Sequence, residues 1–279
     1  MFTLIETFED LGFLNEELLQ CPYVAIDTEF RRTTKDNMKL ALMQVNDSNE
    51  IYLIDCLQIK EPEEVCSFLL SPDTKKIFHS CREDIEAIYS WTKKKVINIY
   101  DTQIANSLLG GSFSISYQGL VKEKIGLEVS KDETRTNWLR RPLSEAQLNY
   151  AASDVYYLID LYRSQTEEFS KTNKLEWLEE ELNSPPSLDT FTKLPSEKIF
   201  NITKKEEREI LSEFNTIVEN SSRIEDINST LLFSKQNQKI LLGNTLAVGV
   251  EKALNGITEW RRNLIKIPFS RLMKNFRVL

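Results

Sequence analysis

Four residues, Asp27, Glu29, Tyr150 and Asp154, have the types and spacing of a site that binds a metal ion through carboxylates. Asp27 and Glu29 end a short apolar run, and side chains two apart on a strand point to the same face of a sheet. Tyr150 and Asp154 are four apart in a segment with helical periodicity, so they project from one face of a helix. Because the single histidine is His79, hydrolytic chemistry in this chain would depend mainly on carboxylates.

Asp84 is the candidate for a further acidic ligand, and it lies in the first turn of a predicted helix. Glu83 and Glu86 compete with it, although acids in a first turn also complement the helix dipole. Asp84 is favoured because it lies one turn before Ile88, on the helix face shared with apolar residues. Asp101 opens the next predicted helix and is better explained as an N-cap than as a ligand.

Both pairs also have ordinary structural explanations, because an Asp-x-Glu pair is often solvated and the Tyr150 helix uses other tyrosines for packing. If the acids do converge, they suit hard cations, and the predicted cofactors are two divalent metal ions, Mg²⁺ or Mn²⁺. Such ions, roughly 3.5–4 Å apart, can activate water for phosphodiester cleavage, and Tyr150 would orient that water. The cysteines form no Cys-x-x-Cys pair and are expected to be buried free thiols, at Cys21, Cys56, Cys66 and Cys81.

Basic residues interleaved with an aromatic precede the Tyr150 helix, a pattern that can hold phosphates and stack a base. The alternative for Arg140 and Arg141 is a solvated loop. The candidates of this kind are Arg135, Trp138, Arg140 and Arg141, with Arg31 and Arg32 directly after Glu29.

Composition and charge fit a soluble globular protein, with 41% apolar and 28% charged residues among 279. No apolar run approaches the roughly 20 residues of a membrane-spanning helix, so we expect a cytoplasmic protein without a membrane partner. The net charge of −8 is uneven along the chain. Residues 187–279 contain 15 Lys and Arg against 11 Asp and Glu, a charge of +4, and residues 1–186 carry −12. The acidic part suits metal capture and the basic part suits nucleic acid.

The periodicity of the first half predicts a mixed sheet with helices packed on it. Strands are predicted at Tyr23–Asp27, Lys39–Val45, Glu50–Asp55, Lys75–His79 and Val96–Tyr100, the first three antiparallel. Helices are predicted at Arg82–Trp91, Thr102–Leu109 and, after a capping box at Ser144, Glu145–Tyr162.

Two adjacent prolines in Asn183–Ser187 indicate a linker, followed by helical periodicity only. The predicted domains are therefore residues 1–182, a linker at 183–193, and a small all-α domain at 194–279. Its helices are expected at Lys204–Asn220, Ile224–Leu232, Lys235–Leu254 and Ile257–Ile265.

Over about residues 20 to 165 the chain resembles ribonuclease D, of the DEDDy group of 3′-to-5′ exonucleases. The resemblance rests on Ala25–Phe30, on Phe78–Asp84 with Asp101–Ala105, and on the long motif Lys131–Leu158. It implies a ribonuclease H-like fold in which Asp27, Glu29, Asp84 and Asp154 bind the metal ions and Tyr150 positions the attacking water. It also implies substrate contacts from Thr28, Phe30, His79, Arg135 and Trp138. The tail resembles one shortened helical domain of the helicase-and-RNase-D C-terminal (HRDC) type.

The function that this resemblance implies is hydrolysis of RNA from a free 3′ hydroxyl to nucleoside 5′-monophosphates by two-metal-ion catalysis. The implied substrates are tRNA precursors and other small structured RNAs. Two alternatives stay open, a 3′-to-5′ exonuclease that acts on DNA and a catalytically idle RNA-binding module. The oligomeric state is left open by the sequence.

Overall fold

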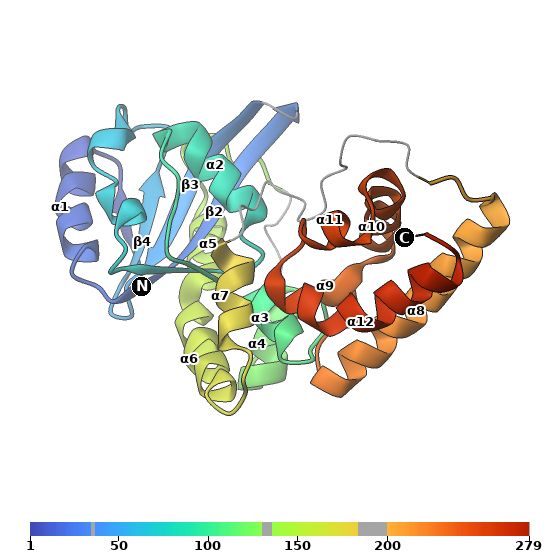
Figure 1. Cartoon of the computed structure of the whole chain (residues 1–279). Helices are drawn as coiled ribbons and strands as arrows, with labels where there is room; N and C mark the ends of the chain where they lie inside the picture. Colours follow the sequence, from blue (N-terminus) through green and yellow to red (C-terminus); the bar gives the residue numbers. More distant parts are fainter. Residues whose placement is uncertain (35–36, 130–135, 184–199, 279) are drawn as a thin grey trace. The chain divides into compact units, whose positions relative to one another are not determined.

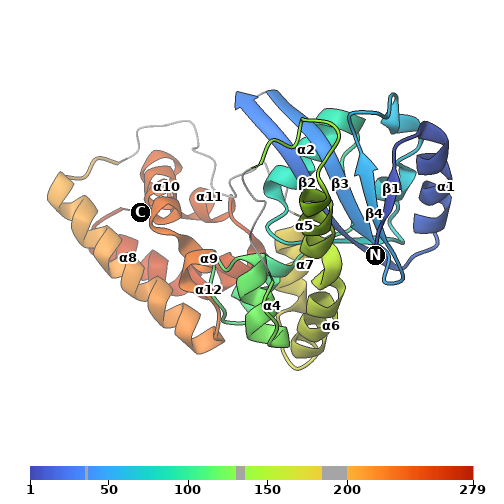
Figure 2. The ribbon, with the colours of Figure 1, turned by 180° about the vertical axis from the view of Figure 1, so that it is seen from behind.

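The computed structural model describes residues 1–34, 37–129, 136–183 and 200–278, which divide into two compact units. The sheet unit comprises Met1–Gln103 and Ser114–Ser170, and the helical unit comprises Ile104–Phe113 and Lys171–Leu279. Figures 1 and 2 show both units from opposite sides. No helix in the described ranges is long and apolar enough to cross a membrane.

The sheet unit contains six strands in the order β1-β4-β3-β2-β5-β6. The strands are β1 (Thr3–Ile5), β2 (Tyr23–Thr34), β3 (Asn37–Asn46), β4 (Ile51–Asp55), β5 (Lys75–Phe78) and β6 (Ile99–Asp101). β2, β3 and β4 pair antiparallel, whereas β1 pairs with β4, β5 with β2 and β6 with β5 in parallel. The predicted mixed sheet and its antiparallel centre are confirmed, and β2 extends seven residues beyond the predicted end at Asp27.

Helices cover both faces of this sheet. They are α1 (Phe8–Leu18), α2 (Arg82–Thr92), α4 (Tyr117–Ile125), α5 (Glu145–Tyr156) and α6 (Leu158–Phe169), with short 3-10 turns at Pro62–Glu64 and Ser67–Leu70. In Figure 1, α2 lies in front of β2 and β3, and in Figure 2, α5 lies in front of them. Side chains of α1 and α2 form one core with alternate residues of the strands, including Leu11, Val24, Ile26 and Ile88. The opposite face of the central strands is left for α5.

Three features of the sheet unit differ from the prediction or were absent from it. β1 was not predicted, because a three-residue strand with two exposed side chains has no recognisable period. α1 was also not predicted, although Leu11, Leu14 and Leu18 have the spacing of a buried helix face. The predicted helix Glu145–Tyr162 is interrupted at Tyr157, which separates α5 from α6. Three of the four predicted free thiols are buried, and Cys21 is half-buried.

The helical unit contains α7 (Leu175–Asn183), α8 (Lys204–Glu225), α9 (Ser229–Phe233), α10 (Lys235–Val248), α11 (Val250–Leu254) and α12 (Glu259–Asn275). The helical unit also includes most of α3 (Thr102–Leu108), the helix that follows β6 directly. The predicted all-helical tail is therefore confirmed. The predicted linker lies almost entirely outside the described residues, and the domain boundaries stay a prediction.

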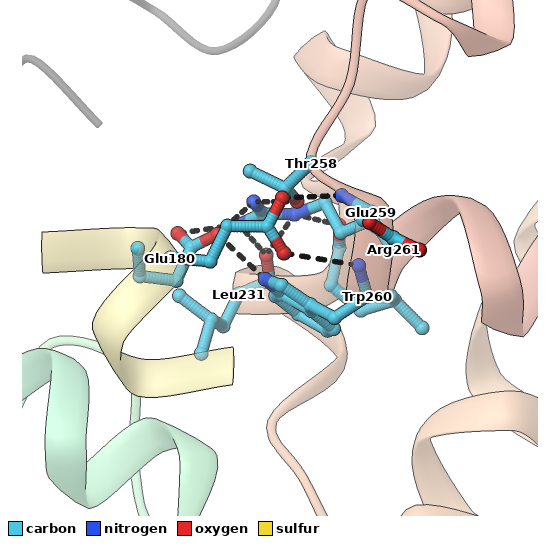
Figure 3. A network of polar contacts seen from close by, with 8 residues as sticks. Glu180, Leu231, Thr258, Glu259, Trp260 and Arg261 are labelled. Carbon is cyan, nitrogen blue, oxygen red and sulfur yellow. Dashed lines mark hydrogen bonds and ion pairs between the residues drawn. The ribbon is translucent and has the colours of Figure 1, made fainter. Parts of the chain in front are cut away.

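A buried polar network joins α7 to α12 (Figure 3). The Arg261 guanidinium is 3% exposed and forms a two-pronged ion pair with the Glu181 carboxylate. It also donates to the Leu231 and Leu232 carbonyls near the end of α9. The Glu180 carboxylate accepts from the first two backbone N–H groups of α12, which lacks a cap from its own N-cap side chain. These contacts group α7 with the helices that follow it.

Candidate active site

Strand β2 places Asp27 and Glu29 on the sheet face that α5 covers. Val24 and Ile26 pack in the core with α2, and alternation along the strand sends Asp27 and Glu29 to the opposite face. In the β2–β3 pair Glu29 lies opposite Leu42, but Phe30 lies opposite Leu40, so the register shifts directly after Glu29. Such a bulge turns the following side chains to a new direction, as is common next to active sites.

Helix α5 brings Asp154 to the same place. Its start is fixed by a capping box. The backbone N–H of Gln147 donates to Ser144 Oγ at 3.2 Å, and the backbone N–H of Ser144 donates to Gln147 Oε1 at 3.0 Å. Two turns later, one carboxylate oxygen of Asp154 lies within 4.8 Å of one from Asp27 and one from Glu29. The structure thus brings together three of the four predicted metal ligands.

Asp84 approaches from the other side of β2. Thr28 lies two residues after Ile26 on β2, so its side chain points to the same face of the sheet as Ile26. Its hydroxyl donates at 2.6 Å to Oδ1 of Asp84, in the first turn of α2. Asp84 is 7% exposed and is not one of the three acids within mutual reach. Its charge nevertheless helps to raise the pKa of Asp27, which indicates that the two carboxylates are neighbours.

Asp101 has the capping role that the sequence predicted. One of its oxygens accepts from the N–H of Gln103 at 2.8 Å, in the first turn of α3. The same carboxylate accepts from the N–H groups of Ser80 and Cys81, directly before α2. Asp101 therefore fixes the turn that starts the helix of Asp84.

The electrostatics of the acid cluster favour a bound cation. Burial raises the pKa of Asp27 well above its ordinary value, with further increases from the charges of Asp84, Asp154 and Glu29. Burial, with the charges of Asp154 and Asp84, raises the pKa of Glu29 to about 9. Burial raises the pKa of Asp84 to about 7 and that of Asp154 to about 6, each opposed by one hydroxyl hydrogen bond. Like charges held this close ionise together only if a positive charge joins them.

The residues present fit a hard divalent cation. All candidate ligand atoms are carboxylate oxygens, the donors that Mg²⁺ and Mn²⁺ prefer. The Oδ1 atom of Asp154 is buried, and in the described ranges it has no hydrogen-bond partner. An acceptor left in this state is costly unless something else satisfies it, and a cation held with Asp27 and Glu29 would do so.

Tyr150 lies one helical turn before Asp154, as the spacing predicted. It is 9% exposed, and its hydroxyl hydrogen-bonds the Asp154 carboxylate. Its ring centroid lies 6.1 Å from that of Trp138. The tyrosine is therefore positioned to orient a small molecule, such as water, beside Asp154.

The predicted substrate residues fall into different situations. Phe30 and Trp138 line one cavity of about 370 Å³ together with Arg31, Thr136, Asn137 and Leu139. Trp138 is 5% exposed, and its Nε1 atom has no hydrogen-bond partner in the described part of the chain. Arg135 lies outside the described residues. Substrate contacts from Phe30 and Trp138 stay predictions that this cavity supports.

His79 is already engaged within the protein. Its Nε2 atom is 2.9 Å from the Ile115 carbonyl, so the ring donates there, and its Nδ1 atom is 2.8 Å from the Thr102 hydroxyl. Burial lowers the pKa of His79. The Nε2 atom thus contacts the segment before α4 and the Nδ1 atom contacts the first residue of α3, so a substrate contact would have to use the ring carbons.

The basic candidates separate into bound and exposed groups. Arg141 forms a two-pronged ion pair with Asp55 of β4 and donates to the Trp138 and Ala41 carbonyls, so it holds the Trp138 segment against β3 and β4. Arg32 pairs with Glu83 and Glu86 of α2. Arg31 and Arg140 are exposed and stay candidates for phosphate contacts.

Gln44 is a residue of this site that the sequence analysis missed. It lies opposite Asp27 in the β2–β3 register and is fully buried, and within the described ranges neither amide atom has a partner. Opposed residues of an antiparallel pair point to the same face, so the amide lies beside the acids. The available signal was a lone polar residue within the apolar run Leu40–Val45.

Comparisons with known proteins agree with this geometry. Residues 2–169 match the family model described as 3′-5′ exonuclease. The chain is 37% identical over 181 residues to ribonuclease D of Shewanella sp. (strain ANA-3), which is 65% of this chain and 47% of that protein. This chain thus spans about half the length of such curated relatives.

Solved structures share the fold. The crystal structure of Escherichia coli RNase D, an exoribonuclease involved in structured RNA processing, matches with a TM-score of 0.64 and 22% identity, over 100% of this chain and 76% of that one. Brucella melitensis NrnC with bound Mg²⁺ matches with a TM-score of 0.57 and 22% identity, over 67% and 90%. The predicted ribonuclease H-like fold and the resemblance to ribonuclease D are confirmed, and the HRDC-like character of the tail stays a prediction.

Proposed function

The chain belongs to the 3′-5′ exonuclease family, and on this premise we propose that it is an exoribonuclease that hydrolyses RNA from a free 3′ hydroxyl to nucleoside 5′-monophosphates. The observation that carries the proposal is the approach of Asp27, Glu29 and Asp154 within 4.8 Å beside the Tyr150 hydroxyl. Four acids with raised pKa values gather here, which is expected of a site that is completed by cations.

The proposed ligands are Asp27, Glu29, Asp84 and Asp154, for two divalent ions, Mg²⁺ or Mn²⁺. Bound ions of this kind supply an activated water and stabilise the leaving oxygen. Tyr150, held by Asp154, orients the attacking water through its hydroxyl. The cavity lined by Phe30 and Trp138 receives the 3′-terminal base. The exposed Arg31 and Arg140 contact the phosphates of the RNA backbone.

RNA is the proposed polymer, and tRNA precursors or other small structured RNAs are the proposed substrates, in the cytoplasm. The experiment is a time course on single-stranded RNA labelled at the 5′ end, with Mn²⁺ or Mg²⁺ and an EDTA control, beside DNA of the same sequence. Metal-dependent shortening of the RNA from its 3′ end is expected. Faster shortening of the DNA would favour the DNA exonuclease instead.

A second binding surface for RNA is proposed on α12. Six basic residues and no acid follow Glu259 in the sequence, and one of them, Arg261, is consumed by the buried pair with Glu181. Arg262 and Lys266 line a polar cavity of about 490 Å³, whose wall also contains Glu251, Leu254, Asn255, Asn263 and Ser270. Along the helix this face continues to exposed Lys274.

Replacing Arg262 and Lys266 by alanine tests this surface. Each lost phosphate contact should reduce the slope of log affinity against log salt by about 0.7 for a single strand. The matched control replaces exposed Lys204 and Lys205, at the start of α8, with the same change in net charge. An equal loss in both double variants would mean that net charge, rather than this surface, binds RNA.

An idle RNA-binding module is the remaining alternative. Asp27→Asn keeps the volume of the side chain but removes a proposed ligand, so it should reduce turnover at least about a hundredfold while RNA binding persists. Asp47→Asn, in the exposed turn between β3 and β4, is the control. Unchanged turnover in Asp27→Asn would sink the site assignment.

A further inference from the structure

The break between α5 and α6 has a side chain at its centre. In an unbroken α-helix the N–H of Tyr157 would donate to the carbonyl of Ser153, four residues earlier. Here the Tyr157 N–H donates to the hydroxyl oxygen of Tyr117 at 3.0 Å, and the same hydroxyl donates to the Ser153 carbonyl at 2.9 Å. The Tyr117 hydroxyl thus occupies the place of one helical hydrogen bond, and insertion of this kind breaks or bends a helix.

Tyr117 is firmly placed for this role. It is 7% exposed and is the first residue of α4, whose N-cap Ser116 accepts from the Gly119 N–H at 3.2 Å. The residue before the cap, Ile115, is held through its carbonyl by His79 Nε2 and by Gln103 Nε2 at 2.8 Å. The His79 ring also meets the Tyr117 ring edge to face, with centroids 6.1 Å apart.

The inserted hydroxyl adjoins the proposed metal site. Asp154 follows Ser153 directly, so the carbonyl that Tyr117 holds belongs to the peptide unit that leads into Asp154. Burial raises the pKa of the Tyr117 hydroxyl, and the charges of Asp154 and Asp27 raise it further, so the group stays a protonated donor. The last turn of α5 is consequently fixed from outside the helix.

We propose that Tyr117 is a positioning residue, whose hydroxyl sets the last turn of α5 so that the Asp154 carboxylate meets those of Asp27 and Glu29. This inference rests on the proposed function only in taking the three acids as metal ligands. A turn that relaxed into a regular helix would rotate the Asp154 backbone, and a ligand displaced by a fraction of an ångström binds its ion less well.

The test is Mn²⁺ binding to the full chain by calorimetry, without RNA, for wild type, Tyr117→Phe and Tyr100→Phe. Tyr117→Phe keeps the ring and loses only the inserted hydroxyl, and the Mn²⁺ dissociation constant should rise about ten- to hundredfold. Tyr100→Phe is the matched control, because its buried hydroxyl donates to Gln165 of α6 at 3.3 Å and, among the described residues, forms no hydrogen bond to α5. Its Mn²⁺ affinity should equal that of wild type.

A rescue distinguishes the hydroxyl from the packing of the ring. Para-aminophenylalanine at position 117 keeps a donor toward the Ser153 carbonyl and a lone pair toward the Tyr157 N–H, so it should restore Mn²⁺ affinity. With limiting Mn²⁺, Tyr117→Phe should also lower kcat and leave the KM for RNA unchanged.

Equal Mn²⁺ affinity in wild type and a folded Tyr117→Phe variant would overturn the inference. So would an equal loss in Tyr100→Phe, or failure of the amino group to rescue. Because binding is measured without RNA, the inference is decided even if the wild-type chain turns out not to degrade RNA.

Discussion

Replacement of Asp154 by asparagine should stabilise the metal-free protein at neutral pH, although it removes a proposed ligand. Burial raises the pKa of Asp154 from 3.8 to about 6, so the folded protein holds its proton more tightly than the unfolded chain does. The folded state therefore loses stability as the pH rises through this range. At about 1.4 kcal/mol per pKa unit, ionisation of Asp154 costs about 3 kcal/mol once the pH exceeds 6.

The assay is urea denaturation in EDTA at a series of pH values, for wild type and Asp154→Asn. Asparagine keeps an acceptor for the Tyr150 hydroxyl and has no charge to bury. The free energy of unfolding of the variant minus that of wild type should rise by about 3 kcal/mol between about pH 4 and about pH 7. Excess Mn²⁺ should then stabilise wild type more than the variant, because a ligand that binds only the folded state favours it.

The control is Asp160→Asn, which removes an acid on α6 that is 54% exposed. Its difference from wild type should stay flat over the same pH range. A flat curve for Asp154→Asn, or a curve that falls with pH, would refute the reasoning that Asp154 is held in the cluster against its own charge.

Three further substitutions test the structure around the site and in the helical unit. Arg141→Ala should lower the free energy of unfolding by about 3–5 kcal/mol in urea denaturation, because it leaves the Asp55 carboxylate, 3% exposed, without its partner. Glu181→Ala should cost a similar amount, because it removes the carboxylate that forms the ion pair with the buried Arg261 guanidinium. Gln44→Met should instead raise the thermal midpoint of the metal-free protein, since it removes a buried amide that has no partner in the described ranges, worth about 1–3 kcal/mol.

Each of these has an outcome that would contradict it. Arg140→Ala and Glu179→Ala, at exposed neighbouring positions, are the controls for the two ion pairs. Losses no larger than in these controls would mean that the pairs contribute nothing measurable. A lower thermal midpoint for Gln44→Met would mean that the amide is satisfied in solution.

The central part of the sheet unit could be predicted because the spacing of its apolar residues follows the two-residue period of a strand or the 3.6-residue period of a helix. Alternation in β2 places Asp27 and Glu29 on one face and Thr28 on the other, and helical spacing in α5 places Tyr150 above Asp154. These relations are local, within five residues, so the sequence contains them. The capping box at Ser144 is equally local and was predicted for the same reason.

The remainder depends on contacts between residues far apart in the chain. The helix break at Tyr157 depends on Tyr117, forty residues earlier in the chain, and the residues next to Tyr157 contain no helix-breaking signal. The sequence left Arg141 open as a phosphate contact or as part of a solvated loop, whereas in the structure its guanidinium pairs with Asp55, 86 residues away. Among the basic residues of the tail, only the structure reveals that Arg261 is buried against α7.

The most direct test of the central claim is the identity of the released product. RNA with a free 3′ hydroxyl is digested with Mn²⁺ in water enriched in heavy oxygen, and the products are analysed by mass spectrometry. Hydrolysis by a water held at the acid cluster predicts nucleoside 5′-monophosphates with one heavy oxygen in the phosphate, none of which form in EDTA. Nucleoside 3′-monophosphates, cyclic phosphates or metal-independent release would contradict it.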